Sequence, residues 1–509
     1  MRGLSERHRA RAARMAAIRA AEDPMRYDFT PDEAAALQAR IYGKVLLPID
    51  ADYPKARMAF SNMFQRWPQL VVECETPGDV VEALAFARRH QLPFVCRSGG
   101  HSTAGYSTCE GMILDVRGLD DVVMSADLTT VTCGAGTPFH KLNDVLETFG
   151  RHVPGGGCSD VCVGGYLQGG GYGLTSMMFG LNCDNVVSML VALADGRIVR
   201  ADATTNADLF WAVRGGTGNN FGVLLEVTYR THELGLLWGF ELQWRLDDAA
   251  HALTRIIDGF TGPAVPRKLG FELLFLTIDD AKMLSMRGIV EGDEDLGRSI
   301  LGPLLRTTGV TVAQSGMGRY AELNSGFFDP VPVVPPTVCT LTDSRFVGVV
   351  EEREWDKVIE YVRRCPDPAT LLALEPYGGA ITSVGRYDNA LIHRDARANV
   401  FTWVFWLQPH DTVGLAYLDE FARVLDPLSI GEAFQNYPNP RYDRAAAAEL
   451  FWKDAYPTLR VVKRKYDPEH CFRFPQGIEP WDSPMPPEHL YVDTSGPIVS
   501  VTGAVTDGE

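Results

Sequence analysis

The feature that most constrains this chain is a pair of segments that are unusually rich in glycine. The first, residues 97–102, reads Arg-Ser-Gly-Gly-His-Ser and directly follows a predicted strand. The second, residues 155–173, contains nine glycines in nineteen positions, which tight turns alone do not explain. Glycine loops expose backbone N–H groups to a pyrophosphate and let the main chain approach a flat ring closely. The two segments therefore predict a binding site for a ligand that carries both groups.

Two other motifs in the chain predict different chemistry, and both are incomplete. Residues 100–104 are similar to the Gly-x-Ser-x-Gly nucleophile elbow of hydrolases, but the last position is Ala104 and a loop follows instead of a helix. Residues 216–221 lack the third glycine of a dinucleotide fingerprint, and no acidic residue about 20 positions on completes a βαβ unit. The sequence thus disfavours a hydrolase and a nicotinamide-dependent enzyme.

Composition narrows the remaining classes. The chain has 509 residues, of which 46% are hydrophobic and 22% charged, as in globular proteins with large cores. Its 48 basic and 65 acidic side chains give a net charge of −17, which argues against nucleic acid as a main partner. No apolar run approaches about 18 residues, so we expect no membrane-spanning helix. Ten dilute cysteines without a CxxC pair do not predict a disulfide scaffold, and we expect no metal site.

Residues 1–24 are rich in alanine and arginine and predict an exposed helical arm, which we extend to residue 39. They lack the apolar core of a secretory signal, although an arginine-rich and acid-poor segment also fits a weak transit peptide. The expected location is therefore the cytoplasm.

The periodicity of the chain predicts an α+β fold. Up to about residue 234, short apolar runs alternate with helix patterns. The expected elements there are strands at residues 92–96, 112–116 and 130–133, a helix capped by Thr76 or Asp79, and a helix over residues 137–149. Alternation from residue 238 to about 425 predicts antiparallel strands with one packed face. A helical stretch over residues 444–466 is expected to end at Asp467-Pro468.

Residues 400–406 predict a central strand of the later sheet. Phe401, Trp403 and Phe405 alternate with Thr402, Val404 and Trp406, so both faces are bulky. One aromatic face of this strand could line a pocket. For each ring considered alone, packing in the hydrophobic core is an equally good interpretation.

Several ordered motifs together resemble the berberine-bridge-enzyme-like flavoproteins, which have the vanillyl-alcohol-oxidase type of FAD-binding fold. The two glycine segments contribute to the resemblance, which extends from about residue 70 to residue 478. The other motifs are residues 218–223 (Gly-Asn-Asn-Phe-Gly-Val), residues 376–379 (Pro-Tyr-Gly-Gly) followed by His393-Arg394, residues 436–438 (Asn-Tyr-Pro), and residues 466–478, which begin Tyr-Asp-Pro-Glu-His-Cys.

The resemblance implies a division of the chain into domains. The expected parts are the arm at 1–39, a PCMH-type FAD-binding domain at 40–235, a substrate-binding domain at 236–430, a berberine-bridge-like segment at 431–480 that completes the FAD domain, and a tail at 481–509.

The resemblance also implies an FAD bound through two covalent bonds. His101 is expected to bond the flavin 8α-methyl carbon, and Cys158 is expected to bond C6, because imidazole and thiolate are suitable nucleophiles for these positions. Cys162 is near enough to compete for the second role, but the family spacing favours Cys158. Many relatives have histidine where this chain has Tyr166, whose hydroxyl can donate a hydrogen bond but carries no positive charge. The other residues expected at the cofactor are Arg97, Ser98, Gly99, Gly100, Ser102, Val161, Gly164, Gly165, Gly169, Gly170, Gly173, Asn220, Gly222, Val223 and Asn436.

The catalytic base is also expected by resemblance. Some relatives have a carboxylate base on the central strand, at a position that is Phe401 here. Tyr437 matches a tyrosine that serves as base in sugar-oxidising and antibiotic-oxidising relatives. A tyrosine with an ordinary pKa of about 10 needs help to lose its proton. Tyr377 and Arg394 are the candidate helpers, the first as a second catalytic tyrosine and the second as a substrate contact beside Phe401, Trp403 and Phe405.

The implied reaction is oxidation of a hydroxyl-bearing small molecule by hydride transfer to flavin N5, followed by reoxidation with O2 to give H2O2. A carbohydrate or oligosaccharide is the first substrate class and a secondary-metabolite alcohol the second. In the family, the residue three after the linking cysteine controls oxygen access, and Val161 predicts an oxidase. A dehydrogenase that uses another acceptor and a flavin-bound binding protein without turnover are the alternatives.

Overall fold

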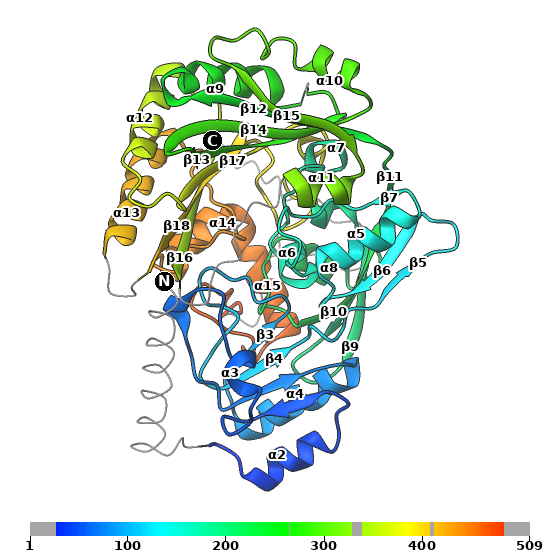
Figure 1. Cartoon of the computed structure of the whole chain (residues 1–509). Helices are drawn as coiled ribbons and strands as arrows, with labels where there is room; N and C mark the ends of the chain where they lie inside the picture. Colours follow the sequence, from blue (N-terminus) through cyan, green and yellow to red (C-terminus); the bar gives the residue numbers. More distant parts are fainter. Residues whose placement is uncertain (1–26, 264, 328–337, 408–411, 483–509) are drawn as a thin grey trace, which may run out of the picture.

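The computed structural model describes residues 27–263, 265–327, 338–407 and 412–482 (Figure 1). The predicted arm over residues 1–24 and nearly all of the predicted tail lie outside these residues. Helices and mostly antiparallel sheets are both extensive, which confirms the predicted α+β class. Within the described ranges, no helix is long and apolar enough to cross a membrane.

Two sheets and several helices form the half of the molecule drawn from blue to cyan-green in Figure 1. The four-stranded sheet has the order β1 (Lys44–Leu46), β2 (Leu70–Glu73), β4 (Met112–Asp115) and β3 (Phe94–Arg97), with β2 and β3 parallel to β4. The five-stranded antiparallel sheet has the order β5 (Val122–Met124), β6 (Thr130–Gly134), β10 (Val223–Arg230), β8 (Val186–Ala192) and β9 (Ile198–Asp202). A short pair joins β7 (Arg151–His152) to β11 (His232–Glu233).

The sequence predicts two helices of this half, and both are present. Its α-helices are α2 (Pro31–Gln38), α3 (Tyr53–Ala56), α4 (Pro77–His90), α5 (Phe139–Thr148), α6 (Val163–Gln168), α7 (Ser176–Phe179) and α8 (Ala207–Val213). The Thr76 hydroxyl accepts from the backbone N–H of Asp79, and the Asp79 carboxylate accepts from the backbone N–H of Thr76 in return. The two predicted caps therefore work as one capping box. The predicted strands are confirmed as β3, β4 and β6, and the predicted helix over residues 137–149 as α5.

A seven-stranded antiparallel sheet forms the other half. Its order is β15 (Thr311–Gly318), β12 (Leu237–Arg245), β14 (Ala281–Glu291), β13 (Leu269–Ile278), β17 (Leu371–Pro376), β18 (Ala398–Trp406) and β16 (Cys339–Val347). The α-helices of this half are α9 (Leu246–Phe260), α10 (Glu294–Ile300), α11 (Tyr320–Phe327), α12 (Glu352–Arg363) and α13 (Val413–Leu425). Helices α9 and α13 pack against the sheet and α12 packs between them, which leaves the opposite face toward the first half (Figure 1). The predicted central strand is β18, which lies inside the sheet but next to the edge strand β16.

The C-terminal segment crosses back to the first half. The predicted single helix over residues 444–466 is two helices, α14 (Arg444–Phe451) and α15 (Tyr456–Tyr466). The break occurs because Pro457 lies in the first turn of α15 and has no backbone N–H to continue the earlier helix. Among the described residues, the short 3-10 turns are η1 (Asn62–Phe64), η2 (Asn182–Asn185), η3 (Ile381–Ser383), η4 (Asp426–Leu428) and η5 (Lys453–Ala455).

A buried ion pair fixes this returning segment. The Lys463 ammonium lies 2.7 Å from the Asp467 carboxylate and also donates to the carbonyls of Asn220 and Phe472. Both charged side chains are fully buried, so removing either partner would leave an uncompensated charge. Asp467 also ends α15, as the sequence predicts.

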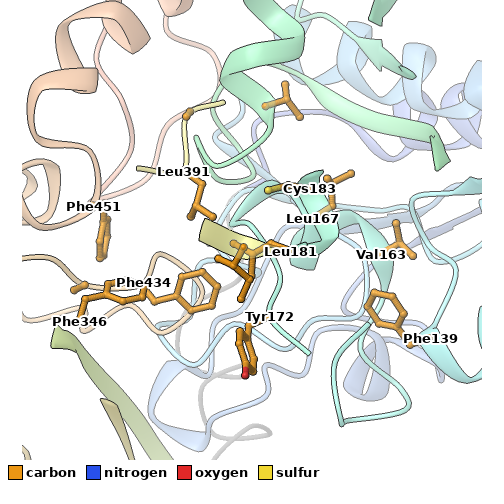
Figure 2. Packing of buried hydrophobic residues seen from close by; sticks show 14 of the residues in the cluster. Phe139, Val163, Leu167, Tyr172, Leu181, Cys183, Phe346, Leu391, Phe434 and Phe451 are labelled. Carbon is orange, nitrogen blue, oxygen red and sulfur yellow. The ribbon is translucent and has the colours of Figure 1, made fainter. Parts of the chain in front are cut away.

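One hydrophobic core runs beneath the second glycine segment. Figure 2 shows Phe434 of the returning segment beside Phe346 of β16 on one side and Phe139 of the first half on the other, and all three belong to one hydrophobic cluster. The first half, the seven-stranded sheet and the returning segment therefore share one hydrophobic core, which includes residues of the second glycine segment.

Candidate active site

A cavity of about 660 Å³ lies between the two halves. One side is formed by the two glycine segments, which we call the loop wall and define as residues 97–102 and 155–173. The other side is the cavity face of β13, β17 and β18, which we call the sheet wall. Residues 434–438 of the returning segment close the space between the walls.

The first glycine segment is held by ion pairing and by a bond to the second. The Arg97 guanidinium is buried and lies 2.6 Å from the Asp115 carboxylate, and it also donates to the carbonyl of Ala56. Arg97 borders the cavity, but its charge is therefore already paired. The Ser98 hydroxyl accepts from the backbone N–H of Gly165 at 3.2 Å, which joins the two loops directly.

His101 lies in the cavity between an aromatic ring and a carboxylate. Its Nε2 is 3.3 Å from Asp160 Oδ1, and its ring centroid is 5.0 Å from that of Phe60. The hydrogen bond to His101 holds the pKa of Asp160 below its usual range. The imidazole is thus oriented by two contacts and remains accessible from the cavity.

The two candidate cysteines differ in their surroundings. Cys158 is half-buried and borders the cavity. Cys162 also borders it but is buried at the start of α6, and burial raises the pKa of its thiol to about 12. A thiol with so high a pKa is a poor nucleophile near neutrality. The environment therefore favours Cys158 over Cys162, as the sequence spacing does.

A helix from the other half holds the loop that carries Cys158. In α11, the Tyr320 hydroxyl donates to the carbonyl of Gly155 at 3.3 Å, and the Asn324 amide donates to that of Gly157 at 3.1 Å. No motif in the sequence pointed to these two residues, because each is a single polar side chain in an ordinary amphipathic helix.

The returning segment contacts the second glycine segment through Asn436. Its side-chain amide donates to the carbonyl of Tyr166 at 3.0 Å. A Cβ on Gly169 would lie only 1.8 Å from the Asn436 side-chain oxygen, so only glycine permits this approach. The Tyr166 hydroxyl donates to the carbonyl of Tyr172, so it stabilises the loop.

The predicted base Tyr437 is paired with a carboxylate that the sequence reading missed. The Tyr437 hydroxyl donates to Glu375 Oε1 at 2.5 Å, and the Asn399 amide donates to Glu375 Oε2 at 2.9 Å. The Tyr437 ring also stacks on Phe401, with centroids 4.2 Å apart. Burial raises the pKa of Glu375 to about 8, and burial beside Glu375 raises the pKa of Tyr437 well above its usual value. A carboxylate therefore lies on β17, next to the strand that carries Phe401.

Glu375 belongs to a polar row that crosses the sheet. Strand pairing aligns Glu241 with Arg287, Arg287 with Glu272, and Glu375 with Asn399. Glu272 and Glu375 flank the aligned pair Leu273 and Leu374, so they are cross-strand neighbours as well. Burial raises the pKa of Glu272 to about 7, which the Arg287 charge opposes.

Several predicted contacts lie away from the cavity. Tyr377 is fully buried, and its ring stacks on Tyr172, so it is corrected from a catalytic to a core residue. Arg394 is buried in an ion pair with Asp184 at 2.7 Å, so it is corrected from a substrate contact to a structural one.

Three predicted cofactor contacts also do not border the cavity, namely Gly169, Gly170 and Asn220. The two glycines allow close approach of Asn436 and Leu391, and the Asn220 amide binds the chain at residues 216, 217 and 478. The remaining predicted residues border it: Arg97, Ser98, Gly99, Gly100, His101, Ser102, Cys158, Val161, Gly164, Gly165, Tyr166, Gly173, Gly222, Val223, Asn436, Tyr437, Phe401, Trp403 and Phe405.

Two family models and several relatives match this chain. Residues 68–202 match the family model described as an FAD binding domain, and residues 433–479 match the model described as berberine and berberine like. The FAD-linked oxidoreductase pgmH of Aspergillus terreus is 35% identical over 465 residues, covering 86% of this chain and 94% of that protein. The carbohydrate oxidase of Microdochium nivale is 27% identical over 467 residues, covering 85% and 92%.

Solved structures agree with these relatives. The carbohydrate oxidase of Microdochium nivale, in complex with a substrate analogue, superposes with a TM-score of 0.80 and 25% identity, covering 88% of this chain and 100% of the other. The glucooligosaccharide oxidase of Acremonium strictum gives a TM-score of 0.80 at 20% identity, covering 88% and 99%, and shares the fold. The chain is an FAD-binding oxidoreductase and belongs to the berberine-bridge-enzyme-like family of FAD-linked oxidases.

Proposed function

We propose that this protein is an oxidase in which His101 and Cys158 hold FAD covalently and a hydroxyl-bearing small molecule is oxidised to the carbonyl. His101 would bond the 8α-methyl carbon and Cys158 would bond C6 of the ring. In the net reaction the alcohol loses two electrons and two protons, and O2 takes them up to form H2O2. The division into an FAD domain at 40–235 with 431–480 and a substrate domain at 236–430 is part of the same proposal.

The shape of the loop wall supports binding of a flat ring. Gly165 is exposed to the cavity, and only the Ser98 hydroxyl oxygen, at 3.7 Å, lies near the place where a Cβ would be. A side chain there would project into the open space, so glycine leaves room for a ligand against the backbone. FAD, when bound, supplies the hydride acceptor at N5 of its isoalloxazine ring.

The observation that carries the proposal is the hydrogen bond between Tyr437 and Glu375 inside this cavity. As the hydroxyl proton of the substrate passes to the Tyr437 oxygen, the Tyr437 proton can pass to Glu375 Oε1. This relay requires no free tyrosinate, which a tyrosine with a raised pKa would rarely provide. Asn399 holds the carboxylate in place by donating to its other oxygen.

Relatives support both the covalent bonds and the reaction class. The glucooligosaccharide oxidase of Acremonium strictum carries a 6-S-cysteinyl, 8α-N1-histidyl FAD. Val161, at the oxygen-controlling position of the family, supports an oxidase over a dehydrogenase. The proposed base needs only a hydroxyl group in its substrate, so carbohydrates and secondary-metabolite alcohols both fit the reaction.

The test compares three single variants in stopped-flow measurements of anaerobic flavin reduction. Tyr437→Phe and Glu375→Gln should each slow reduction by at least about a hundredfold, because removal of a positioned base typically costs about 10²–10⁴ in rate. Tyr377→Phe is the matched control, because its hydroxyl has no hydrogen-bond partner among the described residues and lies outside the cavity. Normal reduction in Tyr437→Phe would exclude it as the base, and slow reduction in Tyr377→Phe would restore that residue as the candidate.

A further inference from the structure

We propose that the substrate is an alcohol with an apolar, ring-sized body, rather than an oligosaccharide. This inference rests on the proposed function and names its substrate class. It comes from the register of the sheet wall, which sorts the side chains that face the cavity into one polar row and several apolar rows.

The apolar rows are continuous across three strands. Leu274 of β13 is aligned with Ala373 of β17, which is aligned with Phe401 of β18. Two residues further along each strand, on the same face, lie Leu276, Leu371 and Trp403, of which the last two are aligned partners. These six residues form a hydrophobic cluster distinct from the main core, and Tyr437 packs against both.

Side-chain exposure shows which rows are deep and which lie at the mouth. Glu375 is 4% exposed, whereas Leu371 and Trp403 are partly exposed, and Pro368 and Ala369 beyond them are exposed. The polar row that holds the base is therefore the deep end. A substrate whose hydroxyl reaches Glu375 and Tyr437 must lay the rest of its body along the apolar rows.

The outer part of the sheet wall offers a sugar few hydrogen bonds besides the Trp403 indole N–H, which has no partner among the described residues. Its side chains carry no charge from Leu274 to Ile278 on β13 or from Phe401 to Phe405 on β18. The Thr277 hydroxyl of β13 donates to the carbonyl of Pro368, and Thr342 of the neighbouring strand β16, which also borders the cavity, is bonded to Thr103 at 2.8 Å. A buried sugar hydroxyl without a partner is unfavourable, whereas an apolar ring gains from the same burial.

Aromatic rings extend this apolar surface toward the loop wall. Phe405, Trp403, Phe60 and His101 form a series with centroid separations of 5.1, 5.9 and 5.0 Å. A flat apolar body can therefore contact rings on two sides, which suits a fused or substituted ring system.

The experiment uses the purified flavoprotein and two groups of alcohols. The first contains 4-methoxybenzyl alcohol and 2-naphthalenemethanol, and the second contains cellobiose, xylobiose and chitobiose. We expect 2-naphthalenemethanol to bind at least about tenfold more tightly than any of the sugars, measured by the change in the flavin absorption spectrum on titration. Tighter binding of a sugar would overturn the inference.

Kinetics separate this inference from the proposed function. If the sugars reduce the flavin and the apolar alcohols neither bind nor react, the inference fails and the proposed function stands. If 2-naphthalenemethanol binds tightly but neither group reduces the flavin, the substrate class is supported and the proposed function fails.

Variants of the apolar rows provide the second measurement. Leu276→Asn and Leu371→Asn should each weaken the binding of 2-naphthalenemethanol about tenfold, because each puts an amide into the proposed contact surface. Met317→Gln is the control, since Met317 lies exposed on the distant edge strand β15. Unchanged binding in both leucine variants would overturn the inference.

Discussion

The loop wall and the sheet wall face each other across one cavity but are built differently. The loop wall meets the cavity largely with glycine backbone, together with the side chains of His101 and Cys158, and contacts between its own segments, such as Gly165 N–H to Ser98, hold it together. The sheet wall meets the cavity with side chains, whose order follows from the register of β13, β17 and β18. A surface made of backbone keeps its shape when side chains in other parts of the protein are substituted. A surface made of side chains changes with each substitution in it. We therefore expect the loop wall to determine the cofactor and the sheet wall to determine the substrate and the proton acceptor.

The largest expected effect tests the loop wall alone. In the wild type we expect the flavin to remain with the protein after denaturation, visible as a fluorescent band on a denaturing gel. His101→Ala and Cys158→Ala should each keep one covalent bond, and the double variant should release all of its FAD. Cys162→Ala is the matched control and should release none. Complete release from the denatured wild type would contradict the proposed bonds.

The second prediction concerns pH and the sheet wall. Glu375 must be ionised to accept a proton, and burial raises its pKa to about 8. Well below that pH the ionised fraction falls about tenfold per unit, so the rate of flavin reduction should rise about fiftyfold from pH 6 to pH 8 and about twofold more before it levels off. Glu375→Gln should remove this dependence. A rate that is flat or falls over this range in the wild type would show that another group controls the proton.

The sequence predicts the loop wall better than the sheet wall, because the residues of the loop wall are close together in the chain. His101, Cys158 and the glycines around them are neighbours in the chain, so a local motif identified them. Glu375 was missed because its partners Tyr437 and Asn399 are remote in sequence and meet it only through strand pairing. Its signal was present, since it is the one charged residue in the otherwise apolar strand β17.

Errors in the predicted site have the same origin. Tyr377 and Arg394 lie in motifs that resemble the family, but a motif does not tell which way a side chain points. Tyr377 follows the end of β17 and turns into the core, where it stacks on Tyr172. The aromatic strand was predicted correctly, because a strict alternation over residues 401–405 places all three rings on one face.

The third prediction asks whether the loop wall also controls oxygen. Val161→Leu should slow reoxidation of the reduced enzyme by about tenfold, equivalent to about 1.4 kcal/mol of barrier, because the longer side chain narrows access beside Cys158. Reduction by substrate should change little. Stopped-flow mixing with air-saturated buffer measures the first step, and Val161→Ala provides a control that should reoxidise at least as fast as the wild type. Equal reoxidation rates in the leucine variant and the wild type would separate Val161 from oxygen access.

The smallest expected effect tests how the sheet wall holds the substrate body. Trp403→Ala should raise KM about tenfold or less with little change in kcat, as expected when a contact made equally in the ground and transition states is lost. Flavin content should stay the same, because Trp403 lies on the sheet wall. A large fall in kcat at unchanged KM would instead assign Trp403 a part in positioning the reacting hydroxyl.

The buried Lys463–Asp467 pair forms late in synthesis, because both residues are near the C-terminal end of the chain. Asn436 and Tyr437 reach the cavity only when the chain up to this ion pair has folded back onto the first half. During synthesis these residues leave the ribosome long after the glycine segments, so the nascent chain presents a cavity that is open on one side. Covalent capture of the flavin is therefore expected to follow release of the finished chain, and a protein truncated before residue 430 should emerge colourless.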